Sequence, residues 1–249
     1  MKINIVSKDK RYIKVNELLL QKGYDSFICS YDQVDKCDCL ILPLGNELSE
    51  TELKAVLINL HPNTLVLSGN KTIIQKHFSG NVIDYSLDEE FLQKNAFLTA
   101  EAAISYLHSI TNETLSGKQI LVTGYGRIAK DLCRLLKAIG ACVFVYARRE
   151  EIREKIIKNG YAAVTLDKCK ICDIIVNTVP SVILSNRLIN SIPNEAYLVD
   201  LASMPYGFET MERVHLGSGL PGKFLPASAA KIVFDTVIQA LSKTGKDNL

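Results

Sequence analysis

The sequence predicts an α/β protein with two doubly wound parallel sheets. Three observations indicate this fold class. Short apolar runs alternate with helical patterns from one end of the chain to the other, and a glycine-rich turn restarts that alternation near the middle. Between the two halves lies a helical segment that no strand precedes. Alternating strands and helices are typical of parallel sheets, because two parallel neighbours need a crossover connection that is usually a helix.

Length and composition are those of an ordinary globular protein. The chain has 249 residues, which allows two domains of about 100–150 residues each. Hydrophobic residues make up 47% and charged residues 22%, which excludes a disordered or low-complexity protein. A net charge of +2 predicts no nucleic-acid or membrane partner, and no apolar run approaches the roughly 18–20 residues of a membrane helix. The N-terminus lacks the features of a signal peptide, so a cytoplasmic location is expected.

Residues 1–97 are predicted to form a first α/β domain. A helix over residues 10–22 carries apolar side chains on one face and has Gly23 just past its end, where glycine commonly stops a helix. Ser49 and Glu52 have the spacing of a capping box and predict a helix that starts there. The other predicted elements of this half are strands over residues 3–6, 26–30, 39–44, 65–67 and 82–84 and a helix over 71–78.

A connecting helix is predicted over residues 98–112. It is rich in small residues, Thr99 is placed to cap its start, and Glu101 falls in its first turn. A second α/β domain is expected over residues 113–226. Its predicted elements are strands over residues 119–123, 142–146, 173–177, 197–201 and 214–216 and helices over 127–139 and 150–159.

The last predicted helix, residues 227–241, is apolar on one face although the second domain is already complete before it. An apolar face must be buried against another element. We therefore expect this C-terminal helix to return to the first domain, so that residues 227–249 complete it.

The seven cysteines are predicted to be reduced thiols, most of them packing residues. An odd number in a chain of this length does not match a secreted disulfide scaffold. Cys37 and Cys39 are one residue apart, and Cys169 and Cys172 form a CxxC pair that precedes a strand instead of opening a helix. A zinc site needs four ligands at recognisable spacing, and the four histidines are scattered, so we predict no metal site.

The strongest chemical signal is a glycine-rich turn between a predicted strand and a predicted helix. Its sequence is Gly124-Tyr125-Gly126-Arg127-Ile128-Ala129. Gly124 would allow the tight turn, Gly126 would let the backbone approach a pyrophosphate, and Ala129 still permits close helix packing. The helix N-terminus would offer N–H groups and a positive dipole to the phosphates. The pattern predicts a Rossmann-like dinucleotide site, and the alternative is a glycine turn without a cofactor.

The end of the next strand predicts which dinucleotide binds. NAD enzymes usually carry Asp or Glu there, about 20 residues after the glycines, to bind the ribose hydroxyls. This chain has Ala147 at that position, followed by Arg148 and Arg149. A carboxylate would repel a 2′-phosphate, whereas guanidinium groups bind it. The pattern favours NADP, and the alternative is two solvated arginines before an acidic helix.

Two further loops follow predicted strands of the second domain. The first is Asn177-Thr178-Val179-Pro180-Ser181, and the second is Asp200-Leu201-Ala202-Ser203-Met204-Pro205. Ligands of doubly wound folds bind at the carboxyl ends of the strands. We expect both loops to border the nicotinamide ribose or ring, and the alternative is a pair of ordinary turns.

With these motifs in view, the chain resembles the family of dipicolinate synthase A subunits, which are enzymes of spore-forming bacteria. The resemblance covers nearly the whole chain. Besides the glycine turn, it is clearest in residues 98–102, 177–181 and 198–203 and in Gly219-Leu220-Pro221-Gly222-Lys223 followed by Pro226. Asp9 and Arg11 also match the family's first loop. The chain departs from the family in its shorter first domain, in a first loop without glycine, and in residues 227–230.

The resemblance implies an NADP-dependent dehydrogenase that oxidises a dihydrodipicolinate-type cyclic imine dicarboxylate to dipicolinate, pyridine-2,6-dicarboxylate. It also implies a partner, the flavoprotein-like B subunit of dipicolinate synthase, and leaves a homo-oligomer open. Oxidation to an aromatic ring removes a hydride and a proton, and a carboxylate near the ring would accept the proton. Glu101 is the candidate acceptor, and Thr99 is a candidate hydroxyl donor to the substrate. Their alternative roles are those of a helix dipole partner and a helix cap.

The substrate carries two carboxylates, which call for cations or helix N-termini. Candidate substrate-binding residues are Asp9, Arg11, Leu220, Pro221, Gly222 and Lys223. We expect the active site in the cleft between the two domains, since both sets of loops would meet there.

Other functions remain open on the sequence. A 2-hydroxy-acid dehydrogenase needs an arginine after the strand that ends at Leu201 and a late histidine, and Ala202, Ser203 and His215 do not supply them. A shikimate-dehydrogenase-like enzyme would need a Lys/Asp pair in the first domain that we do not find. An NADP-binding regulatory protein without catalytic activity is the third alternative, because the glycine turn encodes binding and not turnover.

Overall fold

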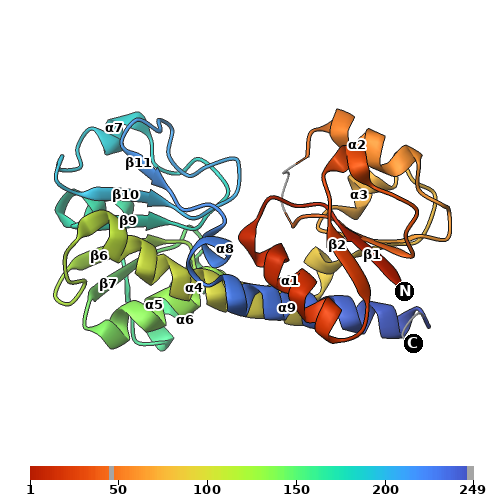
Figure 1. Ribbon diagram of the computed structural model, residues 1–249. Coiled ribbons are helices and arrows are strands. Elements are labelled where there is room, and N and C mark those ends of the chain that lie inside the picture. Colours follow the sequence, from red (N-terminus) through yellow and green to blue (C-terminus); the bar gives the residue numbers. More distant parts are fainter. Residues whose placement is uncertain (45–47, 246–249) are drawn as a thin grey trace. The chain divides into compact units, whose positions relative to one another are not determined.

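The structure is a computed structural model that describes residues 1–44 and 48–245 of the chain. It divides into two compact units. Unit 1 comprises Met1–Asn95 and Pro221–Leu249, and unit 2 comprises Ala96–Leu220. Figure 1 shows a parallel sheet with flanking helices in each unit, which confirms the predicted fold class.

The sheet of unit 1 is parallel and has the strand order β2-β1-β3-β4-β5. Its strands are β1 (Lys2–Ile5), β2 (Asp25–Ile28), β3 (Cys39–Ile41), β4 (Leu65–Ser68) and β5 (Val82–Asp84). Its helices are α1 (Lys10–Gln21), α2 (Glu50–Ile58), α3 (Lys71–Ile74) and α9 (Pro226–Lys243), with 3-10 turns at Tyr31–Gln33 and Tyr85–Leu87. The chain adds β2 on one side of β1 and then adds β3, β4 and β5 on the other side. The strand order therefore reverses between β1 and β3, as in other doubly wound sheets.

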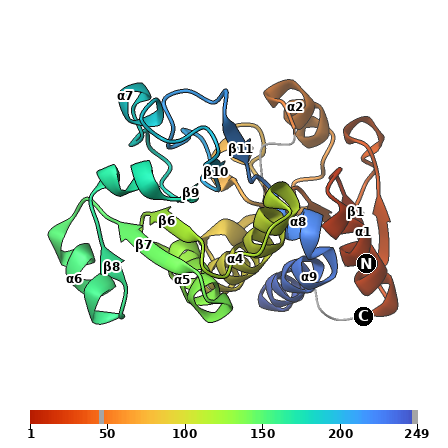
Figure 2. The same ribbon diagram turned by 90° about the vertical axis from the view of Figure 1, so that its left-hand side faces the viewer.

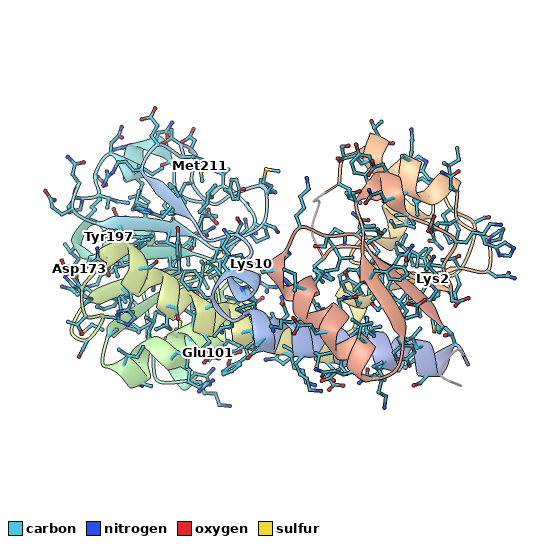
Figure 3. All side chains as sticks on the ribbon, in the orientation of Figure 1. Lys2, Lys10, Glu101, Asp173, Tyr197 and Met211 are labelled. Carbon is cyan, nitrogen blue, oxygen red and sulfur yellow. The ribbon has the colours of Figure 1, made fainter. Side chains whose placement is uncertain are left out.

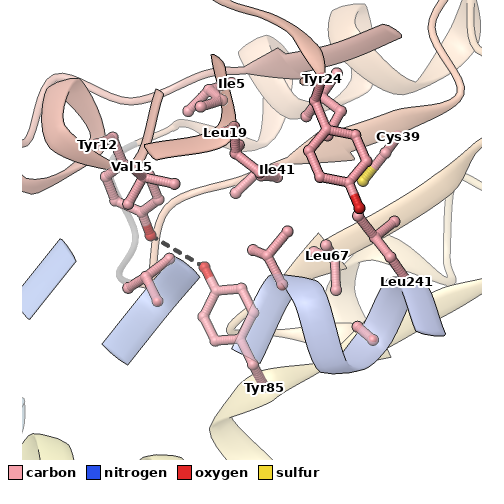
Figure 4. Close-up of a cluster of buried hydrophobic side chains, with 14 of the residues drawn as sticks. Ile5, Tyr12, Val15, Leu19, Tyr24, Cys39, Ile41, Leu67, Tyr85 and Leu241 are labelled. Carbon is pink, nitrogen blue, oxygen red and sulfur yellow. Dashed lines mark hydrogen bonds between the residues drawn. The ribbon is translucent and has the colours of Figure 1, made fainter. Parts of the chain in front are cut away.

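Both faces of this sheet are buried because successive side chains of a strand point to opposite faces. Cys39 and Ile41 of β3 pack in a cluster with α1 and α9, whereas Leu40 between them packs with α2 and α3. In the first cluster the hydroxyls of Tyr12 and Tyr85 lie 3.1 Å apart (Figure 4). Tyr85 donates to the Leu42 carbonyl, so its buried phenol is hydrogen-bonded, and burial raises its pKa. The two tyrosine hydroxyls of this core are therefore partnered.

The C-terminal helix α9 belongs to unit 1, as predicted. Figure 1 shows it running along α1. The side chains on its inner face are buried in the same cluster as Tyr12; they are Ala230, Val233, Val237, Ala240 and Leu241. The apolar face that the sequence predicted is thus covered by unit 1.

The sheet of unit 2 is also parallel and has the order β11-β10-β9-β6-β7-β8 (Figure 2). Its strands are β6 (Gln119–Thr123), β7 (Cys142–Tyr146), β8 (Ala162–Ala163), β9 (Ile174–Asn177), β10 (Tyr197–Asp200) and β11 (Val214–Leu216). Its helices are α5 (Arg127–Ile139), α6 (Glu150–Lys158) and α7 (Asn186–Ile189), with a 3-10 helix at Leu166–Ile171. The strand order reverses between β6 and β9, which is where such sheets bind dinucleotides.

The core of unit 2 contains the CxxC pair. Cys169 and Cys172 are buried beside Leu121, Ile175 and Leu198 of the central strands. Burial raises the pKa of each of the two thiols to about 11. Both therefore act as small packing residues.

The connecting helix differs from its prediction. Helix α4 spans Glu89–Thr111 and so begins before residue 98. Its start is fixed by Asp88, whose side chain accepts a hydrogen bond of 2.7 Å from the Phe91 N–H. Thr99 is consequently an interior residue and not the helix cap, and Glu101 does not lie in the first turn. The prediction was wrong because a threonine is only one of the residues that can cap a helix. Here the Asp88 carboxylate caps it upstream of Thr99, and residues 89–98 belong to the same helix.

The residues Leu220–Phe224 lie outside the helices and strands predicted for the second domain and form a short helix, α8. Gly219 precedes it with a φ of +64°, the left-handed region in which glycine costs least. The boundary of unit 2 lies between Leu220 and Pro221, earlier than the predicted end of the second domain at residue 226. Within the described residues, no helix is long and apolar enough to cross a membrane.

Candidate functional site

The glycine turn of unit 2 has the geometry of a phosphate-binding loop. Gly124 follows β6 with a φ of +91°, and a Cβ there would lie 2.7 Å from Thr178 Oγ1. Only glycine fits at this position. Gly126 precedes α5, and a Cβ there would meet no atom within 4 Å. The N-terminus of α5 is therefore not covered at Gly126. Its first backbone N–H groups can bind an anion there.

A cavity of about 290 Å³ lies beside this turn. Of the residues predicted to bind the cofactor, Gly124, Tyr125, Gly126, Arg148, Arg149 and Val179 line it. Tyr146, Ala147, Ile152, Ser181 and Ile183 complete the lining. The cavity therefore joins the carboxyl ends of β6, β7 and β9.

Tyr125 lines the cavity, and two neighbouring side chains fix its position. Its hydroxyl accepts a hydrogen bond of 2.9 Å from Asn159 Nδ2, and its ring meets Tyr161 edge-on at 6.2 Å. Burial raises the pKa of the phenol, against the opposing effect of the Asn159 hydrogen bond. The ring is thus a fixed neutral surface.

The two arginines of the β7–α6 turn are exposed. Arg149 occupies the N-cap position of α6 and lies 3.8 Å from Glu151, an exposed ion pair that contributes little to stability. The turn is held by Arg153, whose Nη1 donates to the carbonyls of Ala147 (3.3 Å) and Arg148 (2.8 Å). Both arginines are therefore carried on a fixed backbone at the mouth of the cavity.

Asn177, which the sequence predicts to border the nicotinamide, is fully buried, and all of its side-chain polar atoms are hydrogen-bonded. Its Oδ1 accepts from Thr123 Oγ1 at 2.7 Å and from the Val179 N–H at 3.1 Å. Its Nδ2 donates to the Val179 carbonyl and to Asp200 Oδ1, both at 3.0 Å. With every donor and acceptor used, the side chain positions the loop after β9 and has none left for a ligand.

Asp200 at the end of β10 opens the second predicted loop, although the sequence pattern assigned no role of its own to this side chain. Its carboxylate is 1% exposed and accepts three hydrogen bonds, from Asn177 Nδ2 (3.0 Å), the Ala202 N–H (2.9 Å) and the Gly207 N–H (2.7 Å). Gly207 fits only because it has no side chain, since a Cβ there would lie 2.3 Å from Asn177. The residues Thr123, Asn177, Asp200 and Gly207 form one buried polar network.

The remaining predicted cofactor residues do not line the cavity. Thr178 donates through Oγ1 to the Thr123 carbonyl at 2.7 Å. Ala202 is held by its N–H on Asp200, and Ser203 and Pro180 are exposed. Arg127 is exposed and Ile128 half-buried in the first turn of α5.

The two predicted catalytic residues lie on α4 within unit 2. Thr99 is 8% exposed, whereas Glu101 is exposed (Figure 3). The Glu101 carboxylate is thus accessible on the helix surface.

Among the predicted substrate residues, Asp9, Arg11 and Gly222 come together in unit 1. Asp9 caps α1 by accepting from the Arg11 N–H at 2.9 Å and binds the Arg11 guanidinium through two contacts of 2.8 Å. A Cβ on Gly222 would lie 2.4 Å from Asp9 Oδ1, so α8 packs directly on this carboxylate. Burial opposes the charged form of Arg11, but the Asp9 carboxylate outweighs it and raises the pKa of the guanidinium.

The other predicted substrate residues divide by burial. Leu220, Pro221 and Gly222 are buried, and Lys223 is exposed. A second cavity, of about 280 Å³, lies in unit 1 at the carboxyl ends of β3 and β4. Leu42, Pro43, Ser68, Asn70 and Lys76 contribute to its lining, and the predicted substrate residues do not.

The sequence signal for the network was present but incomplete. Asn177 and Asp200 each end an apolar strand, and parallel neighbouring strands end at the same edge of a sheet. That β9 and β10 are neighbours could have suggested the pair. The hydrogen bonds to Thr123 and Gly207 depend on strand order and on the path of a loop, which the pattern does not give.

Comparison with a protein-family model matches residues 74–203 of the chain to the NAD binding domain of D-isomer specific 2-hydroxyacid dehydrogenases. The dipicolinate synthase A subunit of Bacillus subtilis is 24% identical over 286 aligned residues, which cover 98% of this chain and 96% of that protein.

Solved structures with the same fold include A subunits of dipicolinate synthase. The dipicolinate synthase A subunit from Bacillus halodurans has a TM-score of 0.83 at 21% identity and covers 97% of this chain and 98% of its own. Its counterpart from Bacillus subtilis has a TM-score of 0.75 at 22% identity, covering 100% and 98%. A transhydrogenase from Sinorhizobium meliloti reaches 0.70 at 14% identity, covering 98% and 94%. These comparisons confirm the resemblance predicted from the sequence, and the structural likeness shows the fold.

Proposed function

Because the chain belongs to the family of D-isomer specific 2-hydroxyacid dehydrogenases through its NAD binding domain, we propose that it is an NADP-dependent dehydrogenase that forms dipicolinate. Its family makes it an oxidoreductase that uses a nicotinamide cofactor. The proposed substrate is a dihydrodipicolinate-type cyclic imine dicarboxylate, and the proposed setting is spore formation. The relatives named as A subunits of dipicolinate synthase, matched over almost their whole length, support this substrate.

The observation that carries the cofactor proposal is the lining of the cavity in unit 2. An open helix N-terminus at Gly126 lies on one side, and Arg148 and Arg149 stand on the other, after Ala147. The first suits a pyrophosphate, and the second suits a 2′-phosphate in a place where NAD enzymes carry a carboxylate. These residues fit NADP better than NAD.

The reaction removes two electrons and two hydrogens from the substrate ring. Bound NADP⁺ would accept the hydride at C4 of its nicotinamide, and a proton would leave the ring to complete the aromatic product. We assign Glu101 as the proton acceptor, because its carboxylate is accessible on α4. Thr99 is assigned as a hydroxyl donor to the substrate.

Recognition of the two carboxylates is assigned to the residues around α8. Arg11 is already bound to Asp9, so part of its charge is compensated. Lys223 is exposed and is therefore the stronger candidate cation. Gly222 on Asp9 would fix the position of α8, with Leu220 and Pro221 packed beside it.

The direct test is the appearance of NADPH absorbance with freshly generated substrate. It is measured with and without the proposed partner, the flavoprotein-like B subunit of dipicolinate synthase. Formation of NADPH and dipicolinate in equal amounts is the expected result. If the chain binds NADP but neither it nor its mixture with the partner turns over, a non-catalytic regulatory protein is the better description.

A second candidate is reduction of a 2-keto acid, which the family match favours. Against it, the positions after β10 hold Ala202 and Ser203 in place of an arginine. His215 lies within β11, its ring 5.9 Å from that of Tyr197. Oxidation of NADPH or NADH by pyruvate or a longer 2-keto acid would support this alternative.

Replacement of Glu101 tests the proton acceptor. Glu101→Gln should lower kcat by roughly 10²–10⁴-fold with NADP affinity almost unchanged, because the carboxylate acts in the chemical step. Glu90→Gln, which removes an exposed carboxylate elsewhere on α4, is the matched control and should leave kcat near normal. Near-normal turnover of Glu101→Gln would reduce this residue to a surface charge.

A further inference from the structure

Asp200 carries a buried charge that no cation of the described chain neutralises. None of the ion pairs found among residues 1–44 and 48–245 includes Asp200. Its three contacts are all N–H donors, two of the backbone and one of an amide, which is the pattern of a carboxylate held as an anion. Burying an unpaired charge is costly, so its presence at the carboxyl end of β10 needs a reason.

The position of this charge in the sheet suggests the reason. The hydrogen bond between Thr123 and Asn177 spans β6 and β9, the two strands between which the order reverses. Asn177 then links Asp200 on β10 to Val179, which lines the cofactor cavity. In a doubly wound sheet a dinucleotide lies across this reversal, one nucleotide over each half.

The two halves of the sheet carry side chains of opposite charge at their carboxyl ends. The arginines lie on the β7 side, where the half that carries the 2′-phosphate would bind. The nicotinamide half then falls on the β9 and β10 side, which ends in Asp200. The nicotinamide ring is positively charged when oxidised and neutral when reduced, so a fixed negative charge beside it distinguishes the two forms.

We infer that Asp200 is an electrostatic selectivity residue: its buried carboxylate, positioned by Asn177 and Thr123, makes unit 2 bind the oxidised dinucleotide more tightly than the reduced one. This inference rests on the proposed function. It suits an enzyme that consumes NADP⁺, because bound product NADPH is then the more easily released form.

The experiment compares the dissociation constants of NADP⁺ and NADPH by calorimetric titration of the full chain without substrate. Wild-type protein should bind NADP⁺ more tightly than NADPH. Asp200→Asn should lower this preference by about tenfold through weaker NADP⁺ binding, because the charge is removed while the shape is kept. The ratio of the two constants isolates the charge, since a loosened loop would weaken both forms alike.

Thr123→Val is the matched control. This variant removes the hydrogen bond from Thr123 to Asn177 but keeps the charge of Asp200. The affinities for NADP⁺ and NADPH should therefore fall together, and their ratio should stay that of wild type. An unchanged ratio in Asp200→Asn would overturn the inference. If that variant does not fold, the wild type decides, because equal or tighter binding of NADPH contradicts the inference.

Failure of the proposed function gives a different result. If neither NADP⁺ nor NADPH binds to the wild type, the cofactor proposal itself is wrong. If NAD⁺ and NADH bind instead, only the choice of NADP fails, and the same ratio measured with that pair still tests Asp200.

Discussion

In unit 1, the helices that follow β1, β3 and β4 are each capped by a side chain of their own chain, namely Asp9, Ser49 and Asn70. In unit 2, the helices that follow β6, β7 and β9 have Gly126, Arg149 and Ser185 at their N-cap positions. None of these described residues caps its helix through its side chain. The two units share one sheet architecture, so this difference lies in the turns alone.

The comparison shows how one fold carries two chemistries. A helix N-terminus leaves several N–H groups without partners in the helix, and a side-chain cap satisfies some of them. Unit 1 fills its first turn with the Asp9 carboxylate, an anion of its own. Unit 2 leaves the equivalent turn open at Gly126, where an anion from outside can bind. Function in this fold therefore depends on which helix starts are left open.

The largest expected effect is a loss of stability when the Asp9 cap of α1 in unit 1 is removed. Asp9→Ala removes the cap of α1 and leaves the Arg11 guanidinium, 7% exposed, without its carboxylate. Breaking a buried pair by removing one partner costs about 3–5 kcal/mol, and we expect this loss in the free energy of unfolding measured with urea. Asp9→Asn, which keeps a capping oxygen, should lose less. A loss under about 1 kcal/mol for Asp9→Ala would show that the pair does not hold this turn.

The next effect closes the open turn of unit 2. Gly126→Asp would give α5 a cap like that of α1, because the site has room for a side chain and an ordinary φ of −79°. The new carboxylate would occupy the anion site, so affinity for NADP⁺ should fall about 100-fold or more, while stability stays the same or rises by a few tenths of a kcal/mol.

Gly126→Ala provides the control for that variant, because it adds a Cβ without charge or cap and should weaken binding much less. Equal losses in the two variants would point to steric exclusion and not to competition for the helix N-terminus. Both variants can be followed by calorimetric titration.

The smallest effect compares two serines at helix starts. Ser49 accepts from the Glu52 N–H at 3.2 Å and forms a capping box with it, whereas Ser185 precedes α7 without a side-chain cap bond. Ser49→Ala should lower the free energy of unfolding by about 1 kcal/mol, and Ser185→Ala should stay within about 0.5 kcal/mol of wild type. Equal costs in urea unfolding would remove the distinction between capped and uncapped helices.

Patterns within a few residues of one another were predictable from the sequence. The strands β6 and β7 and helix α5 have the predicted bounds, and the capping box at Ser49 forms as expected. Each of these depends on local periodicity or on a cap three residues away, which the sequence contains directly.

Contacts between distant segments were not predictable in the same way. Asn177 has the right position for a ligand-binding loop, but its bonds to Thr123 and Asp200 join residues 54 and 23 positions away. Thr99 has the pattern of a helix cap, but the structure shows that Asp88 caps the helix earlier. Arg11 matches a predicted substrate loop, and the structure pairs it with the Asp9 carboxylate of its own turn. For Asn177 and Thr99 the deciding partner lies outside the local pattern from which the prediction was made.

The most direct test of the cofactor cavity in unit 2 is an equilibrium titration of the full chain with NADP⁺ and with NAD⁺. Wild-type protein should bind NADP⁺ at least about tenfold more tightly, since each charge-assisted hydrogen bond to a 2′-phosphate contributes about 1.5–3 kcal/mol. The double variant Arg148→Ala with Arg149→Ala should bind both equally, and Arg187→Ala, which removes an exposed arginine on α7, should keep the wild-type preference. Equal affinity of the wild type for the two cofactors, or a preference that survives the double substitution, would contradict the assignment of this cavity to NADP.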